Sequence, residues 1–167
     1  MGLSTMTYIL AQQRDRDVVA AFESYANYLQ AHKAQFPPSA YALATSDWYF
    51  DCQDRRCPHD SWLESMIVSE PSKGERSENR ASKLTVLLLG AFQDGHIEFV
   101  YSDVRSYSLS MQNLRNGHGD WRYDEFRLSE GGAVIHEIEW ASLGANGRWL
   151  VEAADVSHQW IPKAGHD

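Results

Sequence analysis

Residues 118–140 read HGDWRYDEFRLSEGGAVIHEIEW, and this stretch carries the strongest structural signal in the chain. Gly131 and Gly132 follow a Ser-Glu pair, which is typical of a tight turn. Aromatic and β-branched residues flank that turn on both sides. The stretch therefore predicts a β-hairpin whose strands cover residues 121–128 and 134–140.

Alternation within the hairpin separates its polar residues by face. On the second strand the apolar-facing set is Val134, His136, Ile138 and Trp140. Glu137 and Glu139 point the other way, so His136 is divided from the neighbouring carboxylates. On the first strand Trp121, Tyr123, Glu125 and Arg127 alternate with Arg122, Asp124, Phe126 and Leu128. Acidic and arginine side chains interleave, which favours cross-strand charge pairs.

Period-two patterning continues on both sides of the hairpin. Further strands are predicted at Trp62–Ser69 and at residues 84–91, 97–101 and 107–111, and Trp149, Val151 and Ala153 alternate with polar neighbours. Such patterning indicates antiparallel sheet with one face on a core. We therefore expect an α+β, mostly β fold: a curved antiparallel sheet of about six to seven strands.

One long helix is predicted over residues 15–35. Val18, Phe22, Tyr25, Leu29 and His32 form an apolar stripe that suits packing on the sheet. Asp15 or Asp17 is the expected N-cap, and the Pro37-Pro38 pair ends the pattern. The aromatic residues 41–52 fit either a short helix or an irregular strand.

The chain is expected to form a single domain over residues 1–167, with its β-rich part at 58–156. Residues 70–82 are polar and charged, which predicts a flexible loop. No apolar run approaches the roughly 20 residues of a membrane span, and the N-terminal residues lack the pattern of a secretory signal. The sequence therefore predicts a cytoplasmic protein, in which Cys52 and Cys57 stay reduced thiols.

Net charge limits the classes of partner. Asp and Glu outnumber Lys and Arg by 23 to 15, so the formal net charge is −8. This balance disfavours nucleic acid and anionic membrane surfaces and suits a basic protein partner. The sequence indicates no cofactor, and it leaves the oligomeric state open.

Three histidine–acid pairs form the candidate polar cluster. Its members are His59, Asp60, His118, Asp120, His136 and Glu137. If the strands that carry them were adjacent, they would suit a metal or general acid/base site, as in a small metal-dependent hydrolase. The structural alternative for His59-Asp60 is a turn in which the Asp60 carboxylate accepts backbone N–H groups. We favour the structural reading and assign no catalytic or metal-binding residue.

The segment PHDSWLESM is followed by an aliphatic strand and then by the segment FVYSDV. Together these parts of the chain resemble small bacterial domains of the immunity-protein type. The matching residues are His59, Asp60, Leu63, Phe99, Tyr101 and Val104, and the resemblance covers residues 58–154. The N-terminal helix and the loop at 70–82 depart from that pattern. The resemblance implies binding and neutralisation of a toxin domain. We therefore expect a non-enzymatic intracellular protein-binding domain, with the metal-dependent hydrolase and a purely structural or interaction domain as alternatives.

Overall fold

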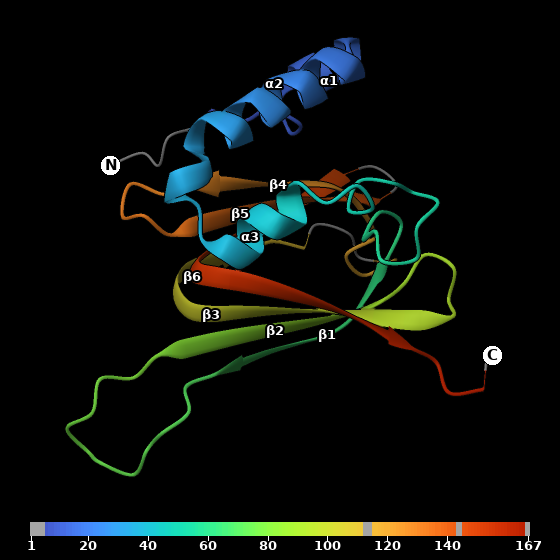
Figure 1. Ribbon diagram of the computed structural model, residues 1–167. Helices are drawn as coiled ribbons and strands as arrows, with labels where there is room; N and C mark the ends of the chain where they lie inside the picture. The colour runs from blue at the N-terminus through green and yellow to red at the C-terminus, as the bar shows by residue number, and fades with distance from the viewer. Residues whose placement is uncertain (1–5, 112–114, 143–144, 166–167) are drawn as a thin grey trace.

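Six antiparallel strands close into a barrel in the computed structural model, which describes residues 6–111, 115–142 and 145–165 (Figure 1). The strands are β1 (Trp62–Ser69), β2 (Ser82–Leu89), β3 (Gly95–Leu109), β4 (Asp120–Leu128), β5 (Val134–Ser142) and β6 (Ala145–Pro162). Their order around the barrel is β1-β2-β3-β6-β5-β4. The predicted α+β, mostly β fold class is confirmed. The prediction that the N-terminus lacks a secretory signal concerns a segment of which residues 1–5 lie outside the described residues.

The barrel interior is built from the alternating residues of its strands. Ile97, Phe99 and Tyr101 of β3 are fully buried, as the sequence pattern predicts. Three tryptophans from three other strands fill the same core, namely Trp121, Trp140 and Trp149. The Trp140 ring lies 5.5 Å from the Trp121 ring in an edge arrangement and 5.0 Å from the Trp149 ring in a tilted one, and such arrangements are favoured for aromatic pairs.

The predicted hairpin forms, but a β-bulge changes the faces of its first strand. Between Trp121 and Tyr123 the register against β5 shifts by one residue. Trp121 consequently faces the interior opposite Trp140, on the same side as Asp124 and Phe126. The prediction that Trp121 shares a face with Tyr123 is therefore wrong. A bulge adds a residue to one strand, and simple alternation then fails across it.

The two strands predicted at residues 97–101 and 107–111 belong largely to one strand, β3. Residues 103–106, expected to be a link, remain paired with β6. Asp103 has φ 48, and the register shifts between Val104 and Ser106. The chain bends at this irregularity without leaving the sheet, so the strand turns a corner of the barrel.

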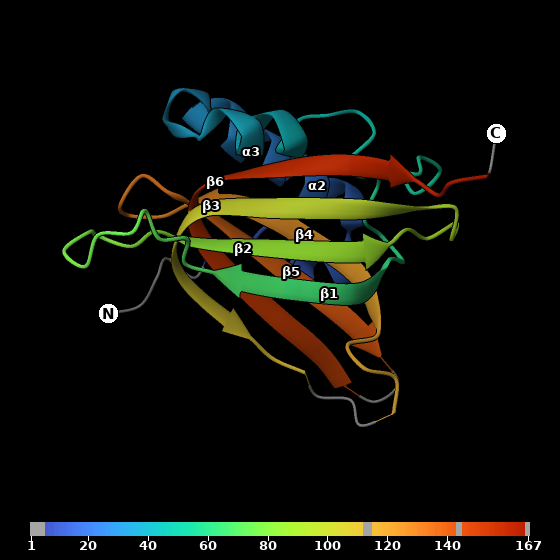
Figure 2. The same ribbon diagram turned by 90° about the horizontal axis from the view of Figure 1, so that it is seen from below.

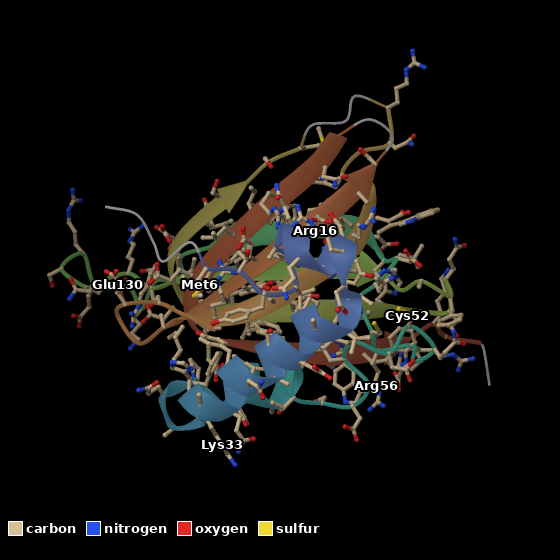
Figure 3. All side chains as sticks on the ribbon, turned by 90° about the horizontal axis from the view of Figure 1, so that it is seen from above. Met6, Arg16, Lys33, Cys52, Arg56 and Glu130 are labelled. Carbon is tan, nitrogen blue, oxygen red and sulfur yellow. The ribbon has the colours of Figure 1, made fainter. Side chains whose placement is uncertain are left out.

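Helices cover the β4–β5–β6 side of the barrel. α1 (Gln12–Arg16) leads into α2 (Val18–His32), and the Asp17 carboxylate caps α2 by accepting the Ala20 N–H at 3.0 Å. The 3-10 turn η1 (Lys33–Gln35) follows, and Pro38 opens α3 (Pro38–Ala44), so the start of the ambiguous segment is helical. Figure 3 looks onto this side and labels Arg16, the last residue of α1, and Lys33, which follows the end of α2.

Tyrosine hydroxyls of α2 satisfy the backbone of β4 on the edge that faces the helix. The Tyr25 hydroxyl donates to the carbonyl of Phe126 at 2.9 Å and accepts its N–H at 2.7 Å. The Tyr28 hydroxyl accepts the N–H of Leu128 at 2.9 Å. β4 therefore needs no strand neighbour along this part of its edge, because α2 supplies the missing partners.

Candidate functional site at the seam of the barrel

The barrel closes between β1 and β4 over a short distance. The pairing across this seam joins Trp62 to Asp120, extended by main-chain bonds from Asp60 N–H to Trp121 O and from Trp121 N–H to Ser61 O. Beyond Trp62, the described residues provide β1 with a paired neighbour on its β2 side alone. Figure 2 shows β1 at the margin of the sheet, on the side away from the helices. In the part of the chain that the structure describes, β1 therefore has a free hydrogen-bonding edge after Trp62.

Large apolar side chains of β1 are exposed next to this free edge. Trp62 is 51% exposed, Met66 41%, Ile67 60% and Val68 43%. Met66 pairs with Val86 and Val68 pairs with Leu84, both of which face the interior and are fully buried. Directly opposed residues share a face, so Met66 and Val68 also point inward. They stay exposed because β4 diverges from β1 beyond the Trp62–Asp120 pair, so that no neighbouring strand among the described residues covers them.

The N-terminal part of the edge carries the protection that natural edge strands commonly show. Glu64 lies at an irregularity between Leu63 and Ser65, and its carboxylate contacts His96 Nε2 at 2.9 Å. Charges and bulges of this kind discourage strand addition. Residues 65–69 carry neither, and three of them are the exposed Met66, Ile67 and Val68. The unprotected part of the edge is therefore its apolar part.

A cavity of about 710 Å³ opens beside the start of β1. It is lined by Trp62, Leu63, Asn116, Gly117, His118, Gly119, Asp120, Ala141 and Ser142. Gly119 has φ 80, and a Cβ there would lie 2.2 Å from the Ala141 carbonyl oxygen. Only glycine permits this approach, which holds residues 116–119 against the end of β5. The close approach of Gly119 to Ala141 therefore fixes the backbone at the rim of the cavity.

His118 joins this cavity to the aromatic core. Its ring lies 5.1 Å from the Trp149 ring and 5.6 Å from the Trp140 ring, measured between centroids. Burial lowers the pKa of His118 below its ordinary value of 6.5, because the charged form loses solvation. The imidazole is therefore neutral at pH 7 and acts as an aromatic wall with a polar edge.

A second polar group of residues lies inside the barrel. Asp124 accepts hydrogen bonds from the Tyr49 hydroxyl at 2.6 Å and from Trp121 Nε1 at 3.0 Å, and contacts His136 Nε2 at 2.7 Å. The other ring nitrogen, His136 Nδ1, lies 2.7 Å from the Tyr101 hydroxyl. All contacts are satisfied when Nε2 carries the proton and Tyr101 donates to Nδ1.

This chain of tyrosine, histidine and aspartate has the residue types of an acid/base site but lacks space for a substrate. His136, Tyr49 and Tyr101 are fully buried. The neighbouring void, which Tyr49 and Asp124 line, measures about 20 Å³. A single water needs at least roughly 10–15 Å³, so about one water fits. The network therefore fixes the orientation of core side chains.

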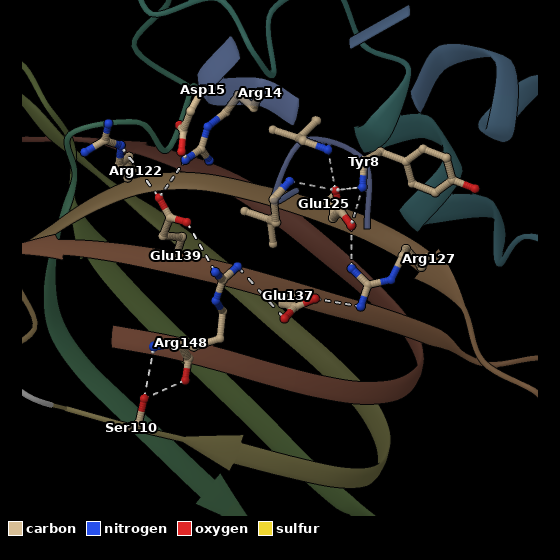
Figure 4. A network of polar contacts seen from close by, with 12 residues as sticks. Tyr8, Arg14, Asp15, Ser110, Arg122, Glu125, Arg127, Glu137, Glu139 and Arg148 are labelled. Carbon is tan, nitrogen blue, oxygen red and sulfur yellow. Dashed lines mark hydrogen bonds and ion pairs between the residues drawn. The ribbon is translucent and has the colours of Figure 1, made fainter. Parts of the chain in front are cut away.

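Glu137 belongs to a separate set of charges on the outside of β4, β5 and β6 (Figure 4). The set contains Arg14, Asp15, Arg122, Glu125, Arg127, Glu137, Glu139 and Arg148. Arg127 bridges Glu125 and Glu137, while the Glu125 carboxylate also accepts the N–H groups of residues 8–10. Positive and negative side chains are equal in number, so the set is neutral and ties the N-terminal segment to the barrel.

His59 and Asp60 lie in the turn before β1. The His59 Nδ1 atom is 3.2 Å from the Asp60 carboxylate, and its ring meets Tyr123 edge-on at 5.4 Å. The Asp60 side chain is 63% exposed, and in the described part of the chain no backbone N–H donates to it. The turn is instead held by the main-chain bonds between residues 60–61 and Trp121, which differs from the predicted carboxylate cap.

The six residues of the predicted polar cluster are distributed among several places. His118 and Asp120 line the cavity, His136 lies in the core, Glu137 lies outside the barrel, and His59 and Asp60 share a turn. Among the residues that the structure describes, no group of three or more His, Cys, Asp or Glu could hold a metal ion. The metal-dependent hydrolase therefore gains no support from these positions.

The exposed edge residues were missed as a site by the sequence reasoning. The triplet Met66-Ile67-Val68 interrupts the alternation of β1, and such an uninterrupted apolar run was the available signal. Asp124 was assigned to charge pairing with arginines, because the bulge that turns it inward is invisible in the sequence.

Within the described residues, no helix is long and apolar enough to cross a membrane. Comparison of the chain with protein-family models, with curated proteins and with solved structures finds no match.

Proposed function

We propose that this chain is a non-enzymatic protein-binding domain, and that an extended segment of its partner adds as a strand to the free edge of β1. The observation that carries the proposal is the coincidence of an unpaired backbone edge with the exposed Met66, Ile67 and Val68. In strand addition the main chain supplies affinity and alternate side chains supply specificity. Both kinds of contact are free on residues 65–69.

Charge favours a basic partner over a second copy of the chain. Two copies with a formal charge of −8 repel each other. Asp60 and Asp120 are exposed beside the start of β1, and Glu64 is on the strand itself. A partner strand with apolar residues along its length and basic residues at the end near Trp62 complements this edge. A basic toxin domain, which the resemblance to immunity-type proteins implies, is a partner of that chemistry.

A designed peptide tests this proposal. The probe is a short amidated peptide of alternating valine and threonine that ends in two lysines. We expect it to slow hydrogen exchange of the β1 amides in residues 65–69 and to shift their NMR signals. The same peptide with a central proline should bind much more weakly, because proline removes a ladder donor.

Two substitutions separate edge binding from general attraction. Ile67→Lys places a charge on the exposed edge and should weaken peptide binding by about tenfold or more. Val19→Lys, at a side chain 63% exposed on α2, is the matched control and should leave binding unchanged. Equal binding of a peptide ending in two glutamates would contradict the proposal. So would a dimer of the free chain whose β1 amides are already protected.

A further inference from the structure

The cavity beside the start of β1 has the size of a small-molecule site. Its volume of about 710 Å³ falls within the roughly 300–1,000 Å³ of pockets that hold drug-sized ligands, and such pockets occur at the mouths of β-barrels. A strand added to residues 65–69 would lie along the other part of β1. The cavity therefore lies beyond the backbone edge that strand addition uses, and the two sites share the carboxylate of Asp120.

Three lining residues stand side by side on three strands. The register pairs Trp62 of β1 with Asp120 of β4, and Asp120 with Ala141 of β5, so all three side chains share one face. The Trp62 indole is half exposed and the Asp120 side chain is exposed. A cation placed between them has a carboxylate on one side and an indole on the other, and both groups bind organic cations.

The remaining lining suits an apolar body. Leu63, Ala141 and the ring of His118 add apolar atoms to the lining. Among the described residues that line the cavity, Asp120 is the one with a charged side chain at pH 7, since His118 is neutral. The Asp120 carboxylate and the formal net charge of −8 of the protein would both repel an anionic ligand. Charge therefore selects a cation.

We propose that the cavity binds a small molecule that has a flat apolar body and a protonated amine, with the amine between Trp62 and Asp120. The flat body occupies the rest of the cavity, which Leu63 and His118 also line. This site needs neither the free backbone of residues 65–69 nor a protein partner, and it shares with the proposed strand addition the carboxylate of Asp120 alone.

Three compounds of matched shape test the site: para-phenylbenzylamine, para-phenylbenzyl alcohol and para-phenylbenzoate. Binding is measured by NMR titration of the Trp62 indole N–H and of the amides of residues 116–119. We expect the amine to bind about tenfold more tightly than the alcohol, and the benzoate to bind more weakly than both.

Two variants and one control identify the residues responsible. Asp120→Asn should weaken the amine by about three- to fivefold and leave the alcohol unchanged, because it removes the ion pair alone. Ala141→Trp should block all three compounds while the added peptide strand still protects β1. Glu130→Gln, in the exposed hairpin turn, should change nothing. Equal affinity for amine and benzoate, or amine binding that Asp120→Asn does not reduce, would overturn the proposal.

Discussion

At the scale of single residues, Asp60 shows how backbone conformation decides the role of a side chain. Its φ of 64 lies in the left-handed region, which aspartate tolerates better than alanine and which glycine adopts freely. The Asp60 N–H donates to the Trp121 carbonyl oxygen at 2.7 Å, which helps to close the seam. The conformation is therefore required by the barrel, whatever the carboxylate contacts.

Substitution at Asp60 separates the backbone from the carboxylate. Asp60→Ala should destabilise the fold by about 1 kcal/mol, which lowers the melting temperature by roughly 2–4 °C for a domain of this size. Asp60→Gly should cause no loss, because glycine adopts this φ without strain. Thermal unfolding followed by circular dichroism compares the two variants. Equal losses in both would show instead that the carboxylate, through His59 or another group, stabilises the turn.

At the scale of elements, two tyrosine hydroxyls of α2 supply β4 with the backbone hydrogen bonds that a neighbouring strand would otherwise make. Tyr25→Phe should destabilise the fold by about 2–4 kcal/mol, because both backbone groups of Phe126 are left buried without a partner. Tyr28→Phe removes one bond at a half-buried position and should cost about 1 kcal/mol. Urea unfolding measures both variants. Tyr41→Phe is the control, since its hydroxyl makes no hydrogen bond with the described residues; an equal loss there would show that removal of a hydroxyl alone, and not of these bonds, destabilises the fold.

Elements with regular alternation could be predicted from the sequence, and those with irregular backbone could not. Ile97, Phe99 and Tyr101 face the core as their spacing indicates, and so do His136 and Ile138. The bulge that turns Asp124 inward depends on pairing with β5, and local sequence does not encode that register. For the same reason the sequence did not predict that β3 continues through Asp103, because a turn-like sequence there stays paired within the sheet.

The candidate site was harder to predict than the strands, because it depends on β1 lacking a strand neighbour beyond Trp62 in the described part of the chain. The sequence correctly indicated β1 at Trp62–Ser69, but the free edge exists only because β4 pairs with it at Trp62 and then turns toward α2. His118 and Asp120 were selected as chemically loaded residues and do line the cavity. Trp62 lies 58 positions before its partner Asp120, and the sequence pattern alone does not bring the two residues together.

At the scale of the whole molecule, buried titratable groups limit stability at both extremes of pH. Burial lowers the pKa values of His118 and His158 below 6.5, so below that pH the unfolded chain binds more protons than the folded one. Stability therefore falls as the pH drops below about 6.5. Burial raises the pKa of Cys57 from 9.0 to about 12 and raises those of Tyr25, Tyr49 and Tyr101 well above 10. Above pH 9 the folded chain retains protons that the unfolded chain loses, so stability falls again.

We expect the melting temperature to be highest between about pH 7 and about pH 9, the interval between the unfolded-state pKa values of histidine and cysteine. Melting followed by circular dichroism across about pH 5 to about pH 11 measures both limbs of the curve. His118→Gln should flatten the acid limb, because the variant removes a group that must gain a proton on unfolding. Cys57→Ala should flatten the alkaline limb between about pH 9 and about pH 12 by the converse argument. Melting temperatures that rise on acidification below pH 6.5 would mean that the folded state, not the unfolded one, takes up the protons, and burial of these histidines would then not govern the acid limb.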